Sequence, residues 1–418
     1  MRIAYISYEY PPDTAFGGIA TYVKQAAALM ATRGHQVEVF SASTRRAGYF
    51  DEKDVGVNLA REPDRASFRE VITPIFADRH RISRFDVVES PEYFGEGRAI
   101  QIAYPRVPHV VKMHTPTQLL RQLTKCRPRL SGYLRHNISQ ARMVFGAIRR
   151  GRMATQYESY RVRRRKIPAV EAMELNCARE STLVVCPSES LRTWVANEWS
   201  IPIDKTMVVP NPYVPSQRLQ SIQPVESPTV VGYLGRLEQR KGIEDFTKAI
   251  PLILAIEPTT RFRIVGDALF HQGTFERYDK YVVRRLRKYK AAIELVGARP
   301  ADEMDEEYSK VDICVFPSIW ENFPNVCLEA MAAGRAVVAS DAGGMAEMLE
   351  GGKHGILIPP RNPNAIANAV LRLLKSADLC RTLGASARRR VLDAYNVQII
   401  GPRMEYSYQK AVEMSKSH

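Results

Sequence analysis

Residues 312–334 have the sequence DICVFPSIWENFPNVCLEAMAAG, and this stretch is the most informative part of the chain. The apolar run 312–316 predicts a buried strand, and residues 325–333 predict a helix that ends at Gly334. A turn rich in proline and serine joins the two. Strand, turn and helix in this order are the repeating unit of a parallel sheet covered by helices.

The same alternation runs along the whole chain, which predicts an α/β protein with two domains. Its 418 residues are enough for two separate cores. Five prolines without periodicity fall between residues 210 and 228, which marks the best boundary. We therefore expect an N-terminal domain (1–212), a linker (213–229), a C-terminal domain (230–396) and a last helix (397–418). The strands predicted are 2–7, 37–41, 86–89, 108–114, 183–186 and 207–209, followed by 230–234, 262–265, 293–296, 312–316, 336–340 and 355–358.

The helix after Pro324 predicts an anion site. Proline suits the first helical position, so the free N–H groups of Asn325 and Val326 would point out of a positive helix end. Glu321 and Glu329 flank this end, and carboxylates accept hydrogen bonds from hydroxyl groups. A ligand with phosphate in its middle and hydroxyls at both ends fits, which indicates a nucleotide-sugar.

A second group of residues supports an anion site. Arg236 and Lys241 follow the predicted strand 230–234 on one loop. Parallel sheets bind ligands beyond the carboxyl ends of their strands, and both cations suit phosphate. Taken alone, such a loop is explained equally well as a basic loop exposed to solvent. The pair of glutamates makes that alternative less attractive.

Together these motifs resemble the retaining GT-B glycosyltransferases of family 4, nearly from end to end. Landmarks of the resemblance are Gly17-Gly18, His114, Asn211, Gly235-Arg236, Lys241-Gly242, Gly266-Asp267, Val296-Gly297, Glu321 and Glu329. The resemblance implies two Rossmann-like domains whose parallel sheets face a central cleft. It also implies that the N-terminal domain binds the acceptor, the C-terminal domain binds the nucleotide-sugar, and the helix from about Val397 crosses back.

The resemblance assigns roles to individual residues. His114 and Glu321 would contact the donor sugar as catalytic residues, and Glu329 would hold the ribose. Gly17 and Gly18 would lie against the donor phosphates, although a glycine turn without function is common. A histidine at a strand end is also often structural. The last assigned residue is Arg299, expected over the nucleobase; an ordinary surface arginine is nearly as plausible.

The sequence contains no Asp-x-Asp and no metal-ligand spacing. We therefore expect no metal or cofactor, because Arg236, Lys241 and the helix end would neutralise the leaving diphosphate. One departure concerns the loop before the helix. Many relatives have glycine where this chain has Asn322 and Pro324, so a stiffer loop with one fewer N–H is expected.

Bulk properties narrow the alternatives. No run is long and apolar enough for a membrane span, and no signal peptide is evident. Six cysteines without a Cys-x-x-Cys pair indicate reduced thiols and a cytoplasmic location. A pI of about 9.6 would suit a nucleic-acid-binding protein, but no such motif appears. A GT-B enzyme of another reaction, such as sugar-nucleotide epimerisation or phosphorolysis, is the other alternative.

Positive charge is concentrated in residues 121–166, which hold fourteen lysines and arginines against one acid, Glu158. This is most of the net charge of +15, and apolar side chains are interleaved. A solvated helical face, a polyanionic acceptor and a surface that docks on anionic lipid are the readings considered. We favour the lipid surface, which would place the enzyme peripherally on the inner face of a membrane.

The function expected from the sequence is therefore transfer of a hexosyl group from a UDP- or GDP-sugar to an acceptor hydroxyl, with retention. The acceptor would be a saccharide or a lipid-linked molecule in bacterial polysaccharide, glycolipid or glycoconjugate synthesis. No nucleic-acid partner is expected.

Overall fold

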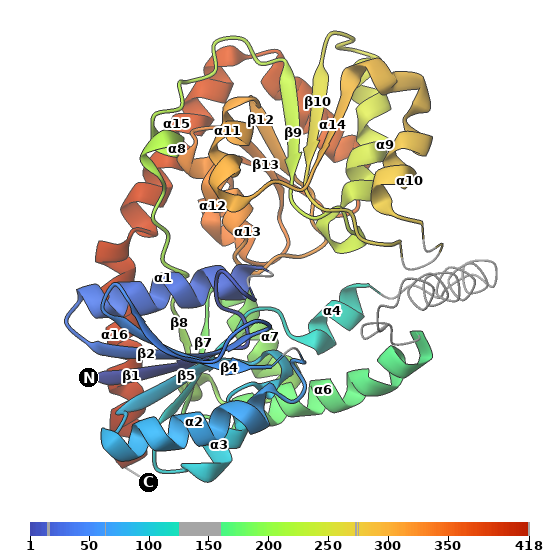
Figure 1. Ribbon diagram of the computed structural model, residues 1–418. Coiled ribbons are helices and arrows are strands. Elements are labelled where there is room, and N and C mark those ends of the chain that lie inside the picture. The colour runs from blue at the N-terminus through green and yellow to red at the C-terminus, as the bar shows by residue number, and fades with distance from the viewer. Residues whose placement is uncertain (15–16, 63, 125–159, 272–273, 275, 417–418) are drawn as a thin grey trace.

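The computed structural model describes residues 1–14, 17–62, 64–124, 160–271, 274 and 276–416. Two parallel sheets form the centres of two domains, stacked one above the other in Figure 1. Helices cover both faces of each sheet. The predicted α/β class with two parallel-sheet domains is confirmed.

The N-terminal sheet has eight strands in the order β3-β4-β2-β1-β5-β6-β7-β8. Ile3 of the central strand β1 pairs with Val37 on one side and Val87 on the other. All neighbours run parallel except β3 and β4, which are antiparallel. The strands are β1 (Arg2–Ile6), β2 (Gln36–Ser43), β3 (Gly48–Glu52), β4 (Val55–Arg61), β5 (Val87–Pro91), β6 (His109–Lys112), β7 (Leu183–Cys186) and β8 (Thr206–Val208).

Three apolar clusters hold the N-terminal helices to this sheet. One face packs against α1 and α16, and the opposite face packs against α2 and α3. A third cluster lies under α4, α6 and α7, with Trp199 fully buried in it. The helices are α1 (Gly18–Thr32), α2 (Phe68–Ile82), α3 (Arg98–Ala103), α4 (Thr117–Leu123), α6 (Tyr160–Glu180), α7 (Glu189–Trp199) and α16 (Val397–Lys416).

The C-terminal sheet has six parallel strands in the order β11-β10-β9-β12-β13-β14. Helices α9, α10 and α14 pack on one face, whereas α11, α12 and α13 pack on the other, together with the C-terminal part of α15. Strands are β9 (Val230–Leu234), β10 (Arg261–Val265), β11 (Ile293–Gly297), β12 (Ile313–Phe316), β13 (Ala336–Ser340) and β14 (Ile356–Ile358). Helices are α9 (Ile243–Leu254), α10 (Tyr278–Arg285), α11 (Met304–Ser309), α12 (Asn325–Ala332), α13 (Gly344–Met348), α14 (Pro363–Leu374) and α15 (Ala377–Ala394).

Two segments connect the domains. Residues 213–229 include the short helix α8 (Gln217–Gln220) and pack on the C-terminal domain through Tyr213 and Leu219. Helix α16 returns from the C-terminal domain and runs along the N-terminal one, as Figure 1 shows in red. There Tyr408 Oη donates to Glu89 at 2.8 Å, and Glu89 also accepts from Tyr22 at 2.8 Å.

The hairpin β3–β4 and the start of α12 differ from the sequence prediction. The hairpin β3–β4 was not predicted, because its turn at Lys53-Asp54 lacks the glycine that usually marks such turns although both residues have positive φ. Pro324 was predicted at the first helical position, which is wrong. It precedes α12 as the cap residue with an extended ψ of 124°, and Asn325 is the first helical residue.

The sequence predicted reduced cysteines and no membrane-spanning segment, and the described residues bear on both predictions. The cysteines at 177, 186, 314, 327 and 380 are free and buried, while Cys126 falls outside the described residues. Among the described helices, none is both long enough and apolar enough to cross a membrane.

Candidate active site

The loop between β12 and α12 joins the two motifs that the sequence suggested separately. The Glu321 carboxylate lies 2.6 Å from Lys241 Nζ and 2.6 Å from Arg240 Nη1. Glu321 is only 6% exposed, so these contacts lie in a largely dry environment. Burial alone would raise the pKa of Glu321, but the charges of Arg240 and Lys241 outweigh it and lower that pKa. A carboxylate and two cations therefore form one charged centre.

The three basic residues of this loop differ in availability. Arg240 is buried and also contacts Glu238 at 2.9 Å, so its charge is neutralised by protein carboxylates. The Arg236 side chain is 54% exposed and has a longer contact of 3.3 Å with Glu238. Arg236 is therefore the cation most open to a ligand. Arg240 was not among the predicted site residues, because the sequence does not show that its side chain turns inward to Glu321.

The N-terminus of α12 opens beside this charged centre. The carbonyl of Pro324 accepts from Cys327 N at 3.0 Å, and no described side chain caps this helix end. A hollow of about 10 Å³, room for about one water, is lined by Lys241, Glu321, Pro324 and Val326 among others. Val326 therefore lies beside Lys241, whereas Asn325, the first residue of α12, is not among the residues lining this hollow.

Glu329 lies further along α12 and is held by Tyr308 of α11. Tyr308 Oη donates to Glu329 Oε2 at 2.8 Å and also contacts the carbonyl of Val326 at 3.0 Å. Burial raises the pKa of Glu329, which the hydrogen bond from Tyr308 partly opposes. Sequence analysis missed Tyr308, because its partner is 21 residues away in the chain.

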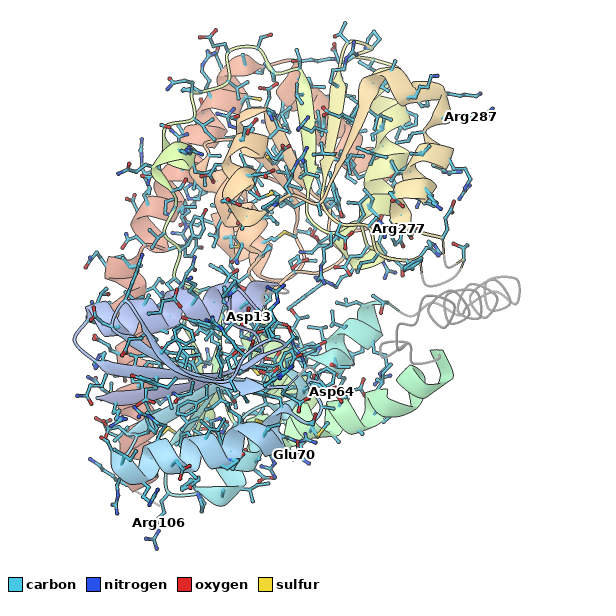
Figure 2. All side chains as sticks on the ribbon, viewed as in Figure 1. Asp13, Asp64, Glu70, Arg106, Arg277 and Arg287 are labelled. Carbon is cyan, nitrogen blue, oxygen red and sulfur yellow. The ribbon has the colours of Figure 1, made fainter. Side chains whose placement is uncertain are left out.

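A cavity of about 630 Å³ lies at the carboxyl ends of β10 and β11, beneath α10. Its wall includes Gly266, Gly297 and Ala298, and Figure 2 shows its lining residue Arg277 on the side of the C-terminal domain that faces the other domain. The residues lining this cavity do not include Arg299. That side chain is exposed beside it and reaches Glu307 at 3.6 Å.

Gly17 and Gly18 begin helix α1 after the carboxyl end of β1. Both are exposed, and a Cβ added at either would meet nothing within 4 Å. The helix has fifteen residues and no side-chain cap at Gly17 within the described structure. Backbone N–H groups are therefore presented at this end, but no described residue crowds the glycines.

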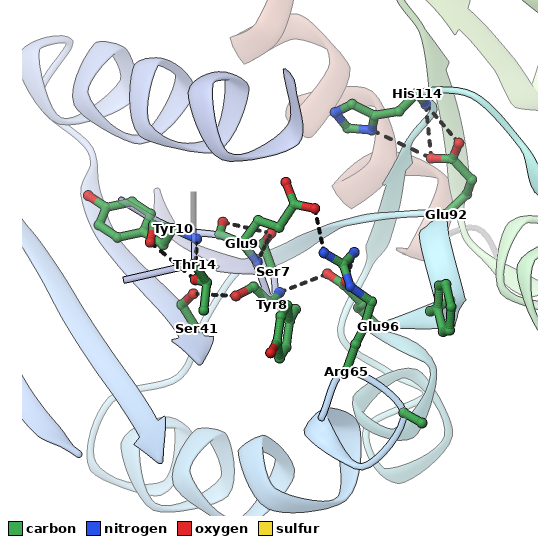
Figure 3. A network of polar contacts seen from close by, with 12 residues as sticks. Ser7, Tyr8, Glu9, Tyr10, Thr14, Ser41, Arg65, Glu92, Glu96 and His114 are labelled. Carbon is green, nitrogen blue, oxygen red and sulfur yellow. Dashed lines mark hydrogen bonds and ion pairs between the residues drawn. The ribbon is translucent and has the colours of Figure 1, made fainter. Parts of the chain in front are cut away.

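His114 follows β6 and is fixed by the buried carboxylate of Glu92 (Figure 3). Its backbone N–H contacts both oxygens of Glu92 at 2.9 Å, and Nδ1 lies 3.0 Å from the carbonyl of Lys112. The ring also packs edge-on against Tyr22, with centroids 5.5 Å apart. His114 Nε2 is buried without a hydrogen-bond partner among the described residues.

A second polar network lies near His114 on the same edge of the N-terminal sheet (Figure 3). Arg65 is ion-paired with both Glu9 and Glu96, and its guanidinium lies 4.8 Å from the ring centroid of Tyr8. Within the described structure Glu9 Oε2 is buried and unpaired. Sequence analysis missed this network, because Glu9 and Arg65 stand outside any recognisable spacing.

The charged centre of the C-terminal domain and His114 of the N-terminal domain meet through the loop that carries Glu321. Asn322 Nδ2 donates to the carbonyl of His114 at 2.6 Å, so the loops that follow β12 and β6 are in direct contact. Two parallel-sheet domains whose strand ends face each other across a charged centre define the GT-B class of fold.

Comparison with known proteins narrows this class to a family. The family described as Glycosyltransferase Family 4 matches residues 16–217, and the family described as Glycosyl transferases group 1 matches residues 228–376. The chain belongs to the family 4, group 1 glycosyltransferases.

Individual relatives agree with this assignment. A glycogen synthase of Mycobacterium tuberculosis is 25% identical, over 98% of this chain and 95% of its own. The structure of sucrose-phosphate synthase from Thermosynechococcus elongatus aligns with a TM-score of 0.74 and 22% identity, covering 98% of both chains. That of Anabaena HepE in complex with UDP-glucose aligns with a TM-score of 0.66 and 17% identity, covering 98% of this chain and 99% of the other.

Proposed function

We propose that this glycosyltransferase moves a hexosyl group from a UDP- or GDP-sugar to an acceptor hydroxyl and retains the anomeric configuration. The observation that carries the proposal is the charged centre of Glu321, Lys241 and Arg240 at the open N-terminus of α12. An exposed arginine, a buried lysine and free helix N–H groups in one place form a site for a diphosphate.

The donor would span the carboxyl edge of the C-terminal sheet. Its diphosphate would pair with Arg236 and Lys241 and accept hydrogen bonds from the N–H groups of Asn325 and Val326. Glu329 would accept hydrogen bonds from the ribose hydroxyls. The nucleobase would enter the cavity beside Gly297 and Ala298, with Arg299 at its rim. The crystal structure of HepE with UDP-glucose supports a nucleotide-sugar donor for a protein of this fold.

The transferred sugar would then lie between Glu321 and His114. Glu321 is held by two cations, which disfavours it as a base on the far side of the sugar. We therefore propose attack from the side of the leaving group, with the acceptor proton passing to the departing phosphate oxygen. The charges of Arg236 and Lys241 would stabilise that phosphate without a metal.

The acceptor would approach from the N-terminal domain, near Gly17, Gly18 and His114. A saccharide or lipid-linked acceptor in bacterial polysaccharide or glycoconjugate synthesis fits, which a glycogen synthase among the relatives supports. Docking on an anionic membrane through residues 121–166 stays a proposal from the sequence, because most of that segment lies outside the described residues.

The test is the stereochemistry of the product, measured by ¹H NMR from α-linked UDP- and GDP-hexoses in the presence of EDTA. Retention gives an α-linked product at an undiminished rate. An inverted product, or loss of activity that returns only with added metal, would refute the mechanism.

A further inference from the structure

Asn322 joins the two domains through a single side-chain amide. Its Nδ2 donates to the carbonyl of His114 at 2.6 Å, and its Oδ1 accepts from Ser188 Oγ at 2.7 Å. Both partners belong to the N-terminal domain, whereas Asn322 belongs to the C-terminal one. The residue is only 5% exposed, so water competes little for either hydrogen bond.

Its neighbours in the loop divide their contacts between the domains. Trp320 packs against the N-terminal apolar cluster that contains Trp199, while Glu321 turns toward Arg240 and Lys241 of its own domain. Asn322 then returns to the N-terminal domain. Three consecutive residues, 320–322, therefore contribute both to the charged centre and to the contact between the domains.

The backbone of this loop is held firmly from behind. Gly344 N donates to the carbonyl of Glu321 at 2.8 Å. A Cβ at Gly343 would lie 2.1 Å from that carbonyl oxygen, and one at Gly344 would lie 1.8 Å from the carbonyl oxygen of Asn322. Such close backbone approach leaves the loop little room to shift. A change in the position of Asn322 would therefore also change the position of Glu321.

We propose that Asn322 is a positioning residue that holds His114 of one domain against the Glu321–Lys241 pair of the other. The inference rests on the proposed function, in which His114 and Glu321 contact the same donor sugar. With the bridge made, the two residues approach the sugar in a fixed relation. Without it, the C-terminal domain would still bind the nucleotide, but His114 would no longer be held against the charged centre of the other domain.

Both halves of the amide are needed for this role. The NH₂ group donates to a carbonyl while the oxygen accepts from a hydroxyl, and aspartate has the same shape but no donor when ionised. Asn322→Asp therefore replaces an attractive contact with His114 O by a repulsive one. Asn322→Ala removes both contacts without adding charge.

A neighbouring contact supplies the matched control. Glu347 of α13 accepts from Ser190 Oγ at 2.6 Å, and it also accepts from the backbone N–H groups of Glu189 and Ser190 at 2.7 and 2.8 Å. Ser190→Ala removes one hydrogen bond across the same interface while leaving the Asn322 bridge and the backbone contacts of Glu347 intact.

The experiment compares wild type with Asn322→Asp, Asn322→Ala and Ser190→Ala. Calorimetry gives the affinity for UDP and GDP, and steady-state kinetics give kcat and KM for hydrolysis of UDP-glucose, UDP-N-acetylglucosamine and GDP-mannose. We expect both Asn322 variants to lower kcat at least tenfold with the fastest donor, with nucleoside-diphosphate affinity within about twofold of wild type. Ser190→Ala should keep kcat within about twofold.

Small-angle X-ray scattering without ligand supplies a readout that does not depend on activity. The Asn322 variants should give a larger radius of gyration than wild type and Ser190→Ala. Unchanged scattering and unchanged kcat would each overturn the inference, as would a parallel loss of kcat and nucleotide affinity. If wild type binds neither UDP nor GDP, the proposed donor site fails, while scattering still decides whether Asn322 holds the domains together.

Discussion

At the scale of single residues, the central feature is the Glu321 carboxylate, which pairs with the cations Arg240 and Lys241. Glu321 holds Lys241 at 2.6 Å, so a donor diphosphate would have to share or displace this contact. The pair thus orients a largely buried lysine. Burial lowers the pKa of Lys241, and the charge of Glu321 opposes that shift.

Glu321 and Glu329 should separate in kinetics. Glu321→Gln should lower kcat about tenfold or more, because a contact with the reacting sugar is lost. Glu329→Gln should chiefly raise the KM for the donor, since a hydrogen bond to a charged group contributes about 1.5–3 kcal/mol in ground state and transition state alike. Steady-state kinetics with varied donor measure both, and the reverse pattern would contradict the assigned roles.

The sequence identified individual chemical groups better than their partners. Glu321 and Lys241 fall on strand-to-helix loops, whose position at the edge of a parallel sheet follows from topology. That Glu321 pairs with Lys241 could not be predicted, because 80 residues separate them. The bridge of Asn322 to His114 depends on how two domains meet, and no pattern within either domain encodes it.

At the scale of elements, α6 carries a buried acid that the mechanism does not use. Glu174 accepts from the N–H and the hydroxyl of Thr117 at 2.8 and 2.7 Å, which ties α6 to the start of α4. Burial, followed by the nearby charge of Glu92, raises the pKa of Glu174 to about 8. At neutral pH the folded protein therefore holds this proton.

This shift predicts a pH dependence of stability. Between the ordinary pKa of 4.5 and about 8, the folded state binds a proton that the unfolded state has released. The contribution of Glu174 to the free energy of unfolding must then fall as pH rises through this window, by up to about 1.4 kcal/mol per pH unit. Glu174→Gln should flatten the dependence between pH 5 and pH 8 in urea titrations. An unaltered slope would show that Glu174 does not titrate there.

The basic segment 121–166 predicts binding to anionic lipid. Each basic side chain near such a surface contributes about 1 kcal/mol, so binding should be firm at low salt and weak at high salt. Co-sedimentation with phosphatidylglycerol vesicles measures it, with neutral vesicles as the control. No binding at low salt, or binding that survives Arg161→Glu, Arg163→Glu, Arg164→Glu and Arg165→Glu together, would exclude this segment as a docking surface.

The sequence predicted the ends of some helices but not of others. Residues 243–254 and 189–199 form helices with the predicted bounds, because glycine or serine precedes each and the apolar spacing is helical. The hairpin β3–β4 was missed for lack of a turn signal. Whether Pro324 begins α12 or precedes it depends on its ψ, which residue type alone does not set.

At the scale of the whole molecule, α16 ties the end of the chain to the centre of the N-terminal sheet. Tyr408 lies fully buried between Tyr5 and Glu89, with both contacts at 2.8 Å. Lys112 lies close to Glu89 and donates to the carbonyl of Val209, where the chain leaves the first domain, at 2.6 Å. One buried network thus joins the returning helix, the central strands and the start of the linker.

Removal of one hydroxyl should weaken this network. Tyr408→Phe leaves Glu89 short of a donor in a buried place, which should lower the free energy of unfolding by about 1–3 kcal/mol. Tyr406→Phe is the matched control, because Tyr406 lies on the same helix and is 56% exposed. Urea unfolding compares the two variants, and equal effects would contradict the role given to the buried network.

The central claim is that Arg236, Lys241 and the start of α12 form one metal-independent diphosphate site, and calorimetry with UDP and GDP in EDTA tests it most directly. Loss of a charge-assisted contact costs about 1.5–3 kcal/mol, so Arg236→Ala and Lys241→Ala should each weaken binding about tenfold or more. Lys248→Ala, which removes a partly exposed lysine on α9, should leave the affinity as in wild type. Unchanged affinity in both Arg236→Ala and Lys241→Ala, or binding by wild type only when metal is added, would contradict the account.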